Sequence, residues 1–104
     1  MREYAAAIIQ LLAPEHGGRT IPTTAIDCHY RPHIRLNPNS AHLGVCLVDG
    51  PNELLPGSTA NVTFLLLYPE VDYTSLLPGT NFQILEGNHI VGSGVIAQRW
   101  AEEA

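Results

Sequence analysis

The segment from Ile26 to Leu36 places polar side chains at every second position. Its four basic members are His29, Arg31, His33 and Arg35. Because side chains of a β-strand point alternately to its two faces, these four are expected to form a line about 20 Å long on one face. Arginine binds phosphate or carboxylate bidentately, and histidine gains charge as the pH falls. This basic strip is a candidate contact surface for an anionic partner. The commoner alternative is the solvated face of an amphipathic strand.

The histidines of the basic strip do not predict a metal site. His29 and His33 would lie about 13 Å apart along an extended strand, whereas zinc ligands lie about 2 Å from the ion. Cys28 would point to the opposite face of the strand from both histidines. We therefore expect no metal and no other cofactor.

The sequence also lacks the spacings of a catalytic centre. The segment Gly92-Ser93-Gly94 does not have the Gly-x-Ser-x-Gly pattern of a nucleophile elbow. Asp49 and Glu53 sit in a predicted turn with no partner pattern that would tune either as an acid or a base. Cys28 and His29 are neighbours in the predicted strand and would face opposite sides, so they cannot form a dyad. We expect a protein that is not an enzyme.

All five of the strongly basic side chains are arginines, and they stand against ten acidic residues for a net charge of −5. The lack of lysine excludes a complete P-loop and Schiff-base lysine chemistry. Affinity for nucleic acid without sequence preference comes mostly from cations placed on phosphates. Strong, general binding of DNA or RNA is therefore disfavoured, although a local basic strip remains compatible with weak binding.

The length of 104 residues fits one domain over residues 1–104, since two halves would each be near the lower limit of independent folding. No apolar run approaches the roughly 20 residues that cross a bilayer, so no membrane contact is expected. The start lacks the apolar stretch of a signal peptide. We expect a cytoplasmic protein in which Cys28 and Cys46 are reduced and partly buried. A bridge between them would need neighbouring strands, which the sequence does not establish.

Glycines and prolines divide the chain into segments too short for long helices. Strands are predicted at Tyr4–Leu12, Ile26–Leu36, Leu43–Val48, Ala60–Tyr68, Asn81–Leu85 and His89–Arg99. The first segment is ambiguous because its alanines also favour a helix. Six short strands separated by turn signals predict an all-β fold, either a small barrel or a sandwich.

Particular positions refine this outline. Gly92 and Gly94 lie two apart in the last predicted strand, which is typical of a bend or a close backbone approach at a barrel corner. Tyr30 is expected to fill the core. The carboxyl end, Trp100–Ala104, is expected to be a short solvated tail that Trp100 anchors or offers to a partner.

Short motifs follow one another in an order that one family shares. They are Gly17-Gly18-Arg19 with Pro22, Tyr30-Arg31-Pro32, Leu55-Pro56-Gly57, Leu67-Tyr68-Pro69, Phe82-Gln83-Ile84 with Glu86-Gly87, and Val91-Gly92-Ser93-Gly94-Val95-Ile96. In this order and spacing the chain, from about Ala5 to Arg99, resembles the C-terminal (third) domain of bacterial elongation factor Tu and its relatives. The resemblance implies a small six-stranded antiparallel closed β-barrel.

The resemblance also implies a set of contact residues. In the family, a separate N-terminal domain binds GTP, so no GTP binding by this chain is expected. The third domain helps to hold aminoacyl-tRNA and packs against the GTPase domain and the nucleotide exchange factor. The tRNA-contacting arginine of the family's Gly-Gly-Arg loop maps onto Arg19, with Thr20 beside it, and the loop Gly87-Asn88 also lies near the tRNA. Because two glycines precede Arg19, we expect its guanidinium to be free to reach a partner, or else to be an ordinary flexible loop residue.

The sequence departs from the family pattern in three ways. Leu85 stands where members typically have arginine, His33-Ile34-Arg35-Leu36 replaces an aromatic-rich stretch, and lysines are missing. Met1 stands almost at the first predicted strand. The expected product is therefore free-standing and not an autonomous translation factor.

These expectations combine into a bacterial, non-enzymatic binding module that docks a protein partner. One form of docking is mimicry, in which the chain occupies a surface that normally meets the third domain of the translation factor. Exposed sheet edges and the strand with Leu65 and Leu67 are expected to supply an apolar patch for a partner or for a second copy of the chain. The alternative is a weak tRNA-binding module that keeps the role of the parent domain in translation elongation.

Overall fold

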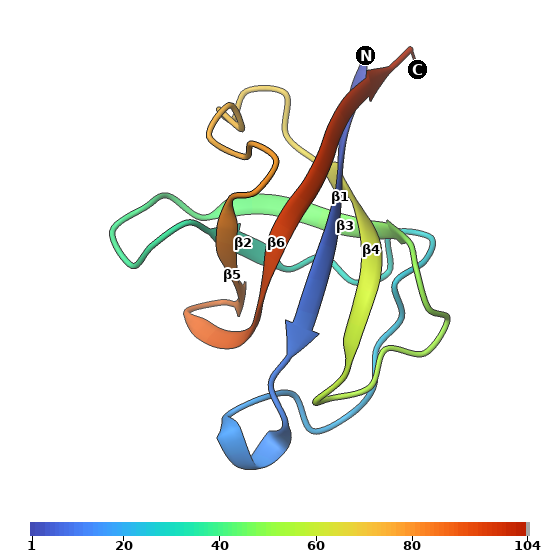
Figure 1. The fold of residues 1–104 in the computed structure, drawn as a ribbon, viewed down its shortest axis with the longest axis vertical. Coiled ribbons are helices and arrows are strands. Elements are labelled where there is room, and N and C mark those ends of the chain that lie inside the picture. The colour runs from blue at the N-terminus through green and yellow to red at the C-terminus, as the bar shows by residue number, and fades with distance from the viewer. Residues whose placement is uncertain (104) are drawn as a thin grey trace.

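The computed structural model describes residues 1–103, which are folded almost entirely as β-structure (Figure 1). The elements are β1 Arg2–Leu11, the 3-10 helix η1 Pro14–His16, β2 His33–Arg35, β3 Leu43–Asp49, β4 Thr59–Leu66, β5 Asn81–Glu86 and β6 His89–Glu102. Neighbouring strands are antiparallel in the order β1-β4-β3-β2-β5-β6, and β6 pairs with β1 to close a barrel. The predicted all-β class and six-stranded closed barrel are confirmed. Within these residues no helix has the length and hydrophobicity to cross a membrane.

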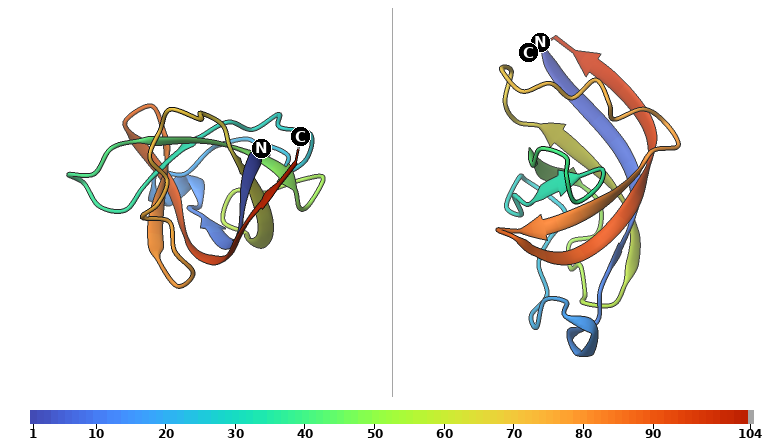
Figure 2. Two further views of the ribbon diagram at one scale, coloured as in Figure 1. Left: turned by 90° about the horizontal axis from the view of Figure 1, so that it is seen from above. Right: turned by 90° about the vertical axis from the view of Figure 1, so that its left-hand side faces the viewer.

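The two ends of the chain form the longest strand pair. β1 and β6 are paired from Arg2 opposite Glu102 to Leu11 opposite Gly92, with a bulge between Ala6 and Ala7. The N- and C-terminal ends consequently lie side by side (Figure 1, Figure 2). The ambiguous first segment is a strand because alternate residues enter the core, and this period-two burial overrides the helix propensity of its alanines.

Inward-pointing side chains from all six strands fill the barrel. They include Ile9, Leu11, Ile34, Val45, Leu47, Phe64, Ile84, Val91 and Ile96. Phe64 of β4 meets Phe82 of β5 edge-on, with 5.7 Å between ring centroids. Gly94 of β6 lies opposite Phe82, and a Cβ at Gly94 would be 2.6 Å from the end of the Phe82 ring. The close approach predicted at this glycine is confirmed.

The strand predicted over Ile26–Leu36 is much shorter than expected. Only His33–Arg35 forms β2, and Asp27 and Cys28 have φ values of 58° and 59° within a turn. Left-handed residues redirect the chain, so the alternation of faces cannot be extended back through them. It does hold after the turn, where Tyr30 and Ile34 are buried. The expected core position of Tyr30 is confirmed.

The last strand is longer than expected. β6 continues to Glu102, so the end of the chain is strand as far as that residue and not an irregular tail, although residues 101–103 are exposed as expected. Ala104 lies outside the described residues. Trp100 stacks on Tyr4 of β1, with 5.7 Å between centroids and 16° between ring planes. This aromatic pair stabilises the β1–β6 ladder near the two ends of the chain.

Cys28 and Cys46 form a disulfide, which contradicts the expectation of two reduced thiols. Cys46 is fully buried on β3 and points away from the interior that Val45 and Leu47 fill. Cys28 reaches it from the left-handed turn, whose Cys28 N–H donates to the carbonyl oxygen of Leu47 at 2.9 Å. The pairing could not be foreseen because Cys28 is in a turn beside β3 and not on a paired strand.

Candidate partner-contact surfaces

The loop after η1 lies at the end of the barrel opposite the chain termini (Figure 1). Arg19 follows η1 in the sequence and is already paired within the chain. Its guanidinium forms an ion pair with the carboxylate of Glu86 on β5. It also lies over the ring of Tyr30, 5.0 Å from the centroid. The Tyr30 hydroxyl donates to Oε2 of Glu86 at 2.6 Å. These three residues are the Arg19 cluster, and Arg19 is not the free guanidinium that the glycines before it suggested.

The pKa values in the Arg19 cluster follow from burial and from the shared carboxylate. Burial on its own would lower the pKa of Arg19, but the hydrogen bond and negative charge of Glu86 outweigh it and raise that pKa. Burial raises the pKa of Tyr30 far above its usual value, and the bond to Glu86 raises it further. The cluster therefore holds a permanent cation on Arg19 and a protonated phenol on Tyr30 at neutral pH.

The other residues implied by the family resemblance lie at the same end of the barrel. Thr20 is exposed and shares with Arg19, Glu86 and His89 an open cleft of about 350 Å³. The exposed pair Gly87-Asn88 makes the turn between β5 and β6, directly after Glu86. The structure thus brings together Arg19, Thr20, Gly87 and Asn88, but it also supplies Glu86, which offsets the charge of Arg19.

The basic strip is divided into separate contacts. Arg35 on β2 donates from Nε to Oε1 of Gln83 on β5 at 2.8 Å. Arg31 is exposed and donates from Nε to the carbonyl oxygen of Cys28 at 3.0 Å. His33 lies beside His42, with 5.9 Å between ring centroids, and His29 follows the left-handed turn. The prediction that all four residues share one strand face is wrong, because only His33 and Arg35 are on a strand.

The described part of the chain contains no group of three or more His, Cys, Asp or Glu side chains that could hold a metal ion. His33 and His42 approach each other, but two imidazoles alone do not complete the four ligands of a typical zinc site.

A surface that the sequence did not single out covers the outer side of β4, β1 and β6. Residues facing outward from these strands form four cross-strand rows without a charged side chain. The rows are Leu65–Tyr4–Trp100, Thr63–Ala6–Gln98, Asn61–Ile8–Val95 and Thr59–Gln10–Ser93. We call these rows the uncharged face. Leu65 lies on it, and Ile8 near its middle is 46% exposed.

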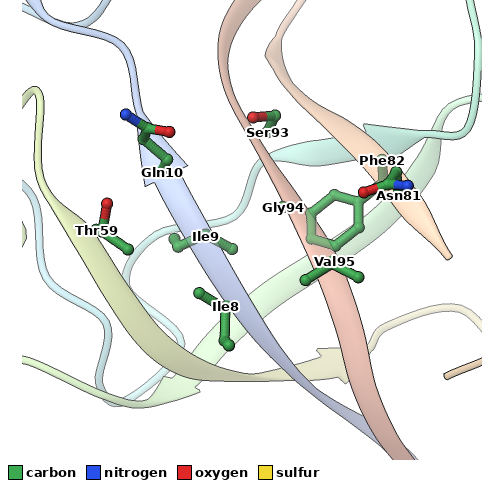
Figure 3. A pocket seen from close by; sticks show the side chains of 9 residues that line it. All are labelled: Ile8, Ile9, Gln10, Thr59, Asn81, Phe82, Ser93, Gly94 and Val95. Atoms are coloured by element: carbon green, nitrogen blue, oxygen red, sulfur yellow. The ribbon is translucent and has the colours of Figure 1, made fainter. Parts of the chain in front are cut away.

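A shallow pocket of about 270 Å³ lies in the uncharged face (Figure 3). Its apolar floor comes from Ile8 and Val95 and from the ring of Phe82, which is reached because Gly94 between them has no side chain. The rim carries the amides and hydroxyls of Gln10, Thr59, Asn81 and Ser93. None of the residues that line this pocket is a carboxylate, histidine or arginine that could activate the Ser93 hydroxyl.

Sequence reasoning found one component of this pocket. The spacing of Gly92 and Gly94 indicated a close backbone approach, but it did not show what lay on the outer side. That required the registers of β6 with β1 and β5, which place Val95 between Ile8 and Asn81. No protein-family model matches this chain. The resemblance to elongation factor Tu rests on the order of its motifs.

Proposed function

We propose that this chain is a non-enzymatic docking module that binds another protein through the uncharged face. The observation that carries the proposal is the run of four neutral rows in a chain with five arginines and ten acidic residues. The buried centres of protein–protein interfaces are likewise depleted in charge, and they place anchor side chains in pockets with a polar rim. The pocket at Gly94 has this composition.

The chemistry of the face indicates what kind of partner surface it accepts. A charged partner side chain buried against the four rows would lose its hydration without meeting an opposite charge, which is costly. We expect the partner to insert one apolar side chain between Ile8 and Val95. Amide, hydroxyl or backbone groups of the partner would then meet Gln10 and Asn81 around it.

The size of the face limits the strength of the complex. With about 4.8 Å between strands and about 6.8 Å between rows, the four rows cover roughly 400 Å². Stable complexes bury about 800 Å² on each partner, and weaker, transient ones bury less. We therefore expect a transient complex unless neighbouring loops enlarge the contact.

The family resemblance suggests which proteins to test first. Proteins that meet the third domain of elongation factor Tu are candidate partners, and this chain would compete for them by mimicry. The nucleotide exchange factor of elongation factor Tu is the first purified probe, and a second copy of the chain is the next.

The alternative, tRNA binding, has less support in the observed contacts. Arg19 is paired with Glu86, Arg31 with a carbonyl oxygen and Arg35 with Gln83. Each arginine would have to exchange a contact within the chain for a phosphate, and three such contacts give only weak binding. A gel shift of tRNA that is undetectable even at low salt would reject this alternative.

The docking proposal is tested with Ile8→Arg, which places a charge in the middle of the uncharged face at a side chain that is already 46% exposed. Leu77→Arg is the matched control, because Leu77 is 60% exposed in a loop outside that face. Proteins retained from native lysate, followed by titration of the purified partner and of the exchange factor, give the readout. We expect Ile8→Arg to weaken binding at least about tenfold and Leu77→Arg to leave it within about twofold. Equal binding by both variants, or no stoichiometric partner for the unmodified chain, would overturn the proposal.

A further inference from the structure

The Cys28–Cys46 disulfide holds a turn whose backbone conformation is unfavourable by itself. Asp27 and Cys28 both lie in the left-handed region, with φ values of 58° and 59°. Residues with a Cβ seldom adopt this conformation, and two in succession are rarer because the steric cost applies to each. Such a turn persists only while its surroundings hold it in place. The disulfide is the covalent part of those surroundings.

The two cysteines differ in their access to solvent. Cys46 lies within β3 and is fully buried, whereas Cys28 is only partly buried. Thiol–disulfide exchange requires a thiolate to reach one of the two sulfurs. A reductant can therefore approach this bridge from the side of Cys28.

We propose that Cys28–Cys46 is a site of reversible reduction by a dithiol reductant, which attacks Cys28 and so releases the turn of residues 26–29. The attacking thiolate forms a bond to Sγ of Cys28 while the Sγ–Sγ bond breaks, and Cys46 leaves with the electron pair and takes up a proton. The second thiol of the reductant then attacks the mixed disulfide, which frees Cys28 as a thiol. The dithiol is oxidised to a disulfide and supplies both electrons and both protons.

The hydrogen bonds on either side of the turn confine the change. Beyond it, Leu47 N–H donates to the carbonyl oxygen of Tyr30 at 3.0 Å, and Val45 N–H donates to that of Pro32 at 3.2 Å. Before it, Ala25 N–H donates to the carbonyl oxygen of Pro51 at 3.0 Å. These bonds and the buried Tyr30 keep both flanks on the barrel after reduction. Within the turn itself, the backbone bonds are those from Cys28 N–H to Leu47 and, at 3.3 Å, from His29 N–H to Ile26. One side-chain bond, from Arg31 to the carbonyl oxygen of Cys28, adds to them.

Release of the turn changes the basic strip. Arg31 is held by the carbonyl oxygen of Cys28, one of the two left-handed residues. When that residue leaves its conformation, the guanidinium of Arg31 loses its acceptor and becomes available to an anionic partner. Arg35 keeps its bond to Gln83, because β2 is unaffected. The redox state of the bridge thus determines how many cations the strip offers.

The first test identifies the sulfur that is attacked. The oxidised protein is incubated with reduced glutathione, quenched in acid and mapped by peptide mass spectrometry. We expect the glutathione adduct on Cys28 in at least about tenfold excess over Cys46, since Cys28 is partly exposed and Cys46 is fully buried. An adduct mainly on Cys46, or a bridge that excess dithiothreitol does not open in the folded protein, would overturn the proposal.

The second test measures the release of the turn by amide hydrogen exchange with and without dithiothreitol. We expect residues 26–29 to exchange at least about tenfold faster after reduction, while β1 and β6 keep their protection. The double variant Cys28→Ser/Cys46→Ala should match the reduced protein in either condition. Unchanged exchange in the turn, or loss of protection in β1 and β6, would contradict a local switch.

The variant Asp27→Gly separates backbone strain from the loss of the covalent link. Glycine accepts positive φ without a steric cost, so the reduced turn should keep its conformation better in this variant. We expect the increase in exchange on reduction to be at most about a third of that in the unmodified chain. An equal increase would show that strain at Asp27 does not open the turn.

Discussion

Glu86 determines what the Arg19 loop offers to a partner. A single oxygen of this carboxylate accepts hydrogen bonds from both Tyr30 and Arg19, and Arg19 is 67 residues away in sequence. The motif order pointed to Arg19 and Glu86-Gly87 separately, but it could not pair them. Their contact depends on where the loop after η1 lies against β5. A cation with a carboxylate partner must exchange that partner before it can bind a phosphate.

Replacing Glu86 by Gln should release Arg19 for an anion while keeping an oxygen acceptor for the Tyr30 hydroxyl. We expect Glu86→Gln to bind labelled tRNA at low salt about fivefold more tightly than Glu53→Gln, a difference of about 1 kcal/mol for a partly exposed ion pair. Glu53 is an exposed turn residue, so its variant changes the net charge equally. Fluorescence anisotropy gives the comparison. Equal affinities would mean that Glu86 does not restrain Arg19.

Tyr30 and Tyr73 should ionise late in alkaline titration. Burial raises the pKa of both phenols, and Tyr73 also donates to the carbonyl oxygen of Gly44 at 2.5 Å. Because the folded-state pKa is above the unfolded value of about 10, the contribution of the protonated phenol to the free energy of unfolding is fully present below about pH 10. That stability is lost as the pH rises further, through the folded-state pKa. Absorbance at 295 nm should show Tyr30 and Tyr73 ionising above the pH at which free tyrosine ionises, and this late step should shrink after Tyr30→Phe. No late step in the folded protein, or a late step that Tyr30→Phe leaves unchanged, would contradict this.

At the scale of elements, the period-two pattern located the strands but not every path between them. It found β3 to β6 within a few residues, because each carries alternating or continuous apolar side chains bounded by turn residues. It failed at residues 26–29, where Asp27 and Cys28 leave the extended conformation although neither is glycine. Residue propensities do not predict this left-handed conformation, and Cys46, the disulfide partner that stabilises it, is distant in sequence. The uncharged face was missed for a related reason, since it is defined by the registers between strands.

Gly94 connects the packing of the core with the docking pocket. A methyl group there would lie 2.6 Å from the Phe82 ring and 2.7 Å from the carbonyl oxygen of Ile8. We expect Gly94→Ala to lower the free energy of unfolding by about 1–3 kcal/mol, because the core would be overpacked. Ser93→Ala, at the exposed neighbouring position, should change it by less than about 0.5 kcal/mol. Urea titrations of both variants measure the difference, and equal stabilities would show that β6 can move away from Phe82.

At the scale of the whole molecule, the barrel is closed by the two ends of the chain. The β1–β6 ladder is the longest in the sheet, whereas β2 and β3 are joined by only two residue pairs, His33 with Gly44 and Ile34 with Leu43. Arg99 of β6 strengthens the closing pair through an ion pair with Glu3 of β1 at 3.3 Å. It also donates to the carbonyl oxygens of Tyr73 and Leu76 in the loop between β4 and β5, each at 2.9 Å. The most extensive pairing therefore has the greatest separation in sequence, and such pairings slow folding.

A circular permutant should make the β1–β6 pairing local in sequence and the β2–β3 pairing distant. Joining residues 103 and 1 with a short Gly/Ser linker makes the β1–β6 ladder a local hairpin, since Arg2 and Glu102 are already paired. Opening the chain between Pro38 and Asn39, in an exposed turn, leaves the weak β2–β3 pairing as the distant one. We expect the permutant to fold about tenfold faster than the original order, because loop-closure entropy then opposes the shorter ladder.

Both orders are compared in the Cys28→Ala/Cys46→Ala background, so that the bridge across the new opening does not constrain either chain. Stopped-flow refolding with Trp100 fluorescence gives the rates. An equal or slower rate in the permutant would show that the β1–β6 ladder forms after the slow step, and that the barrel nucleates in β3, β4 or β5 instead.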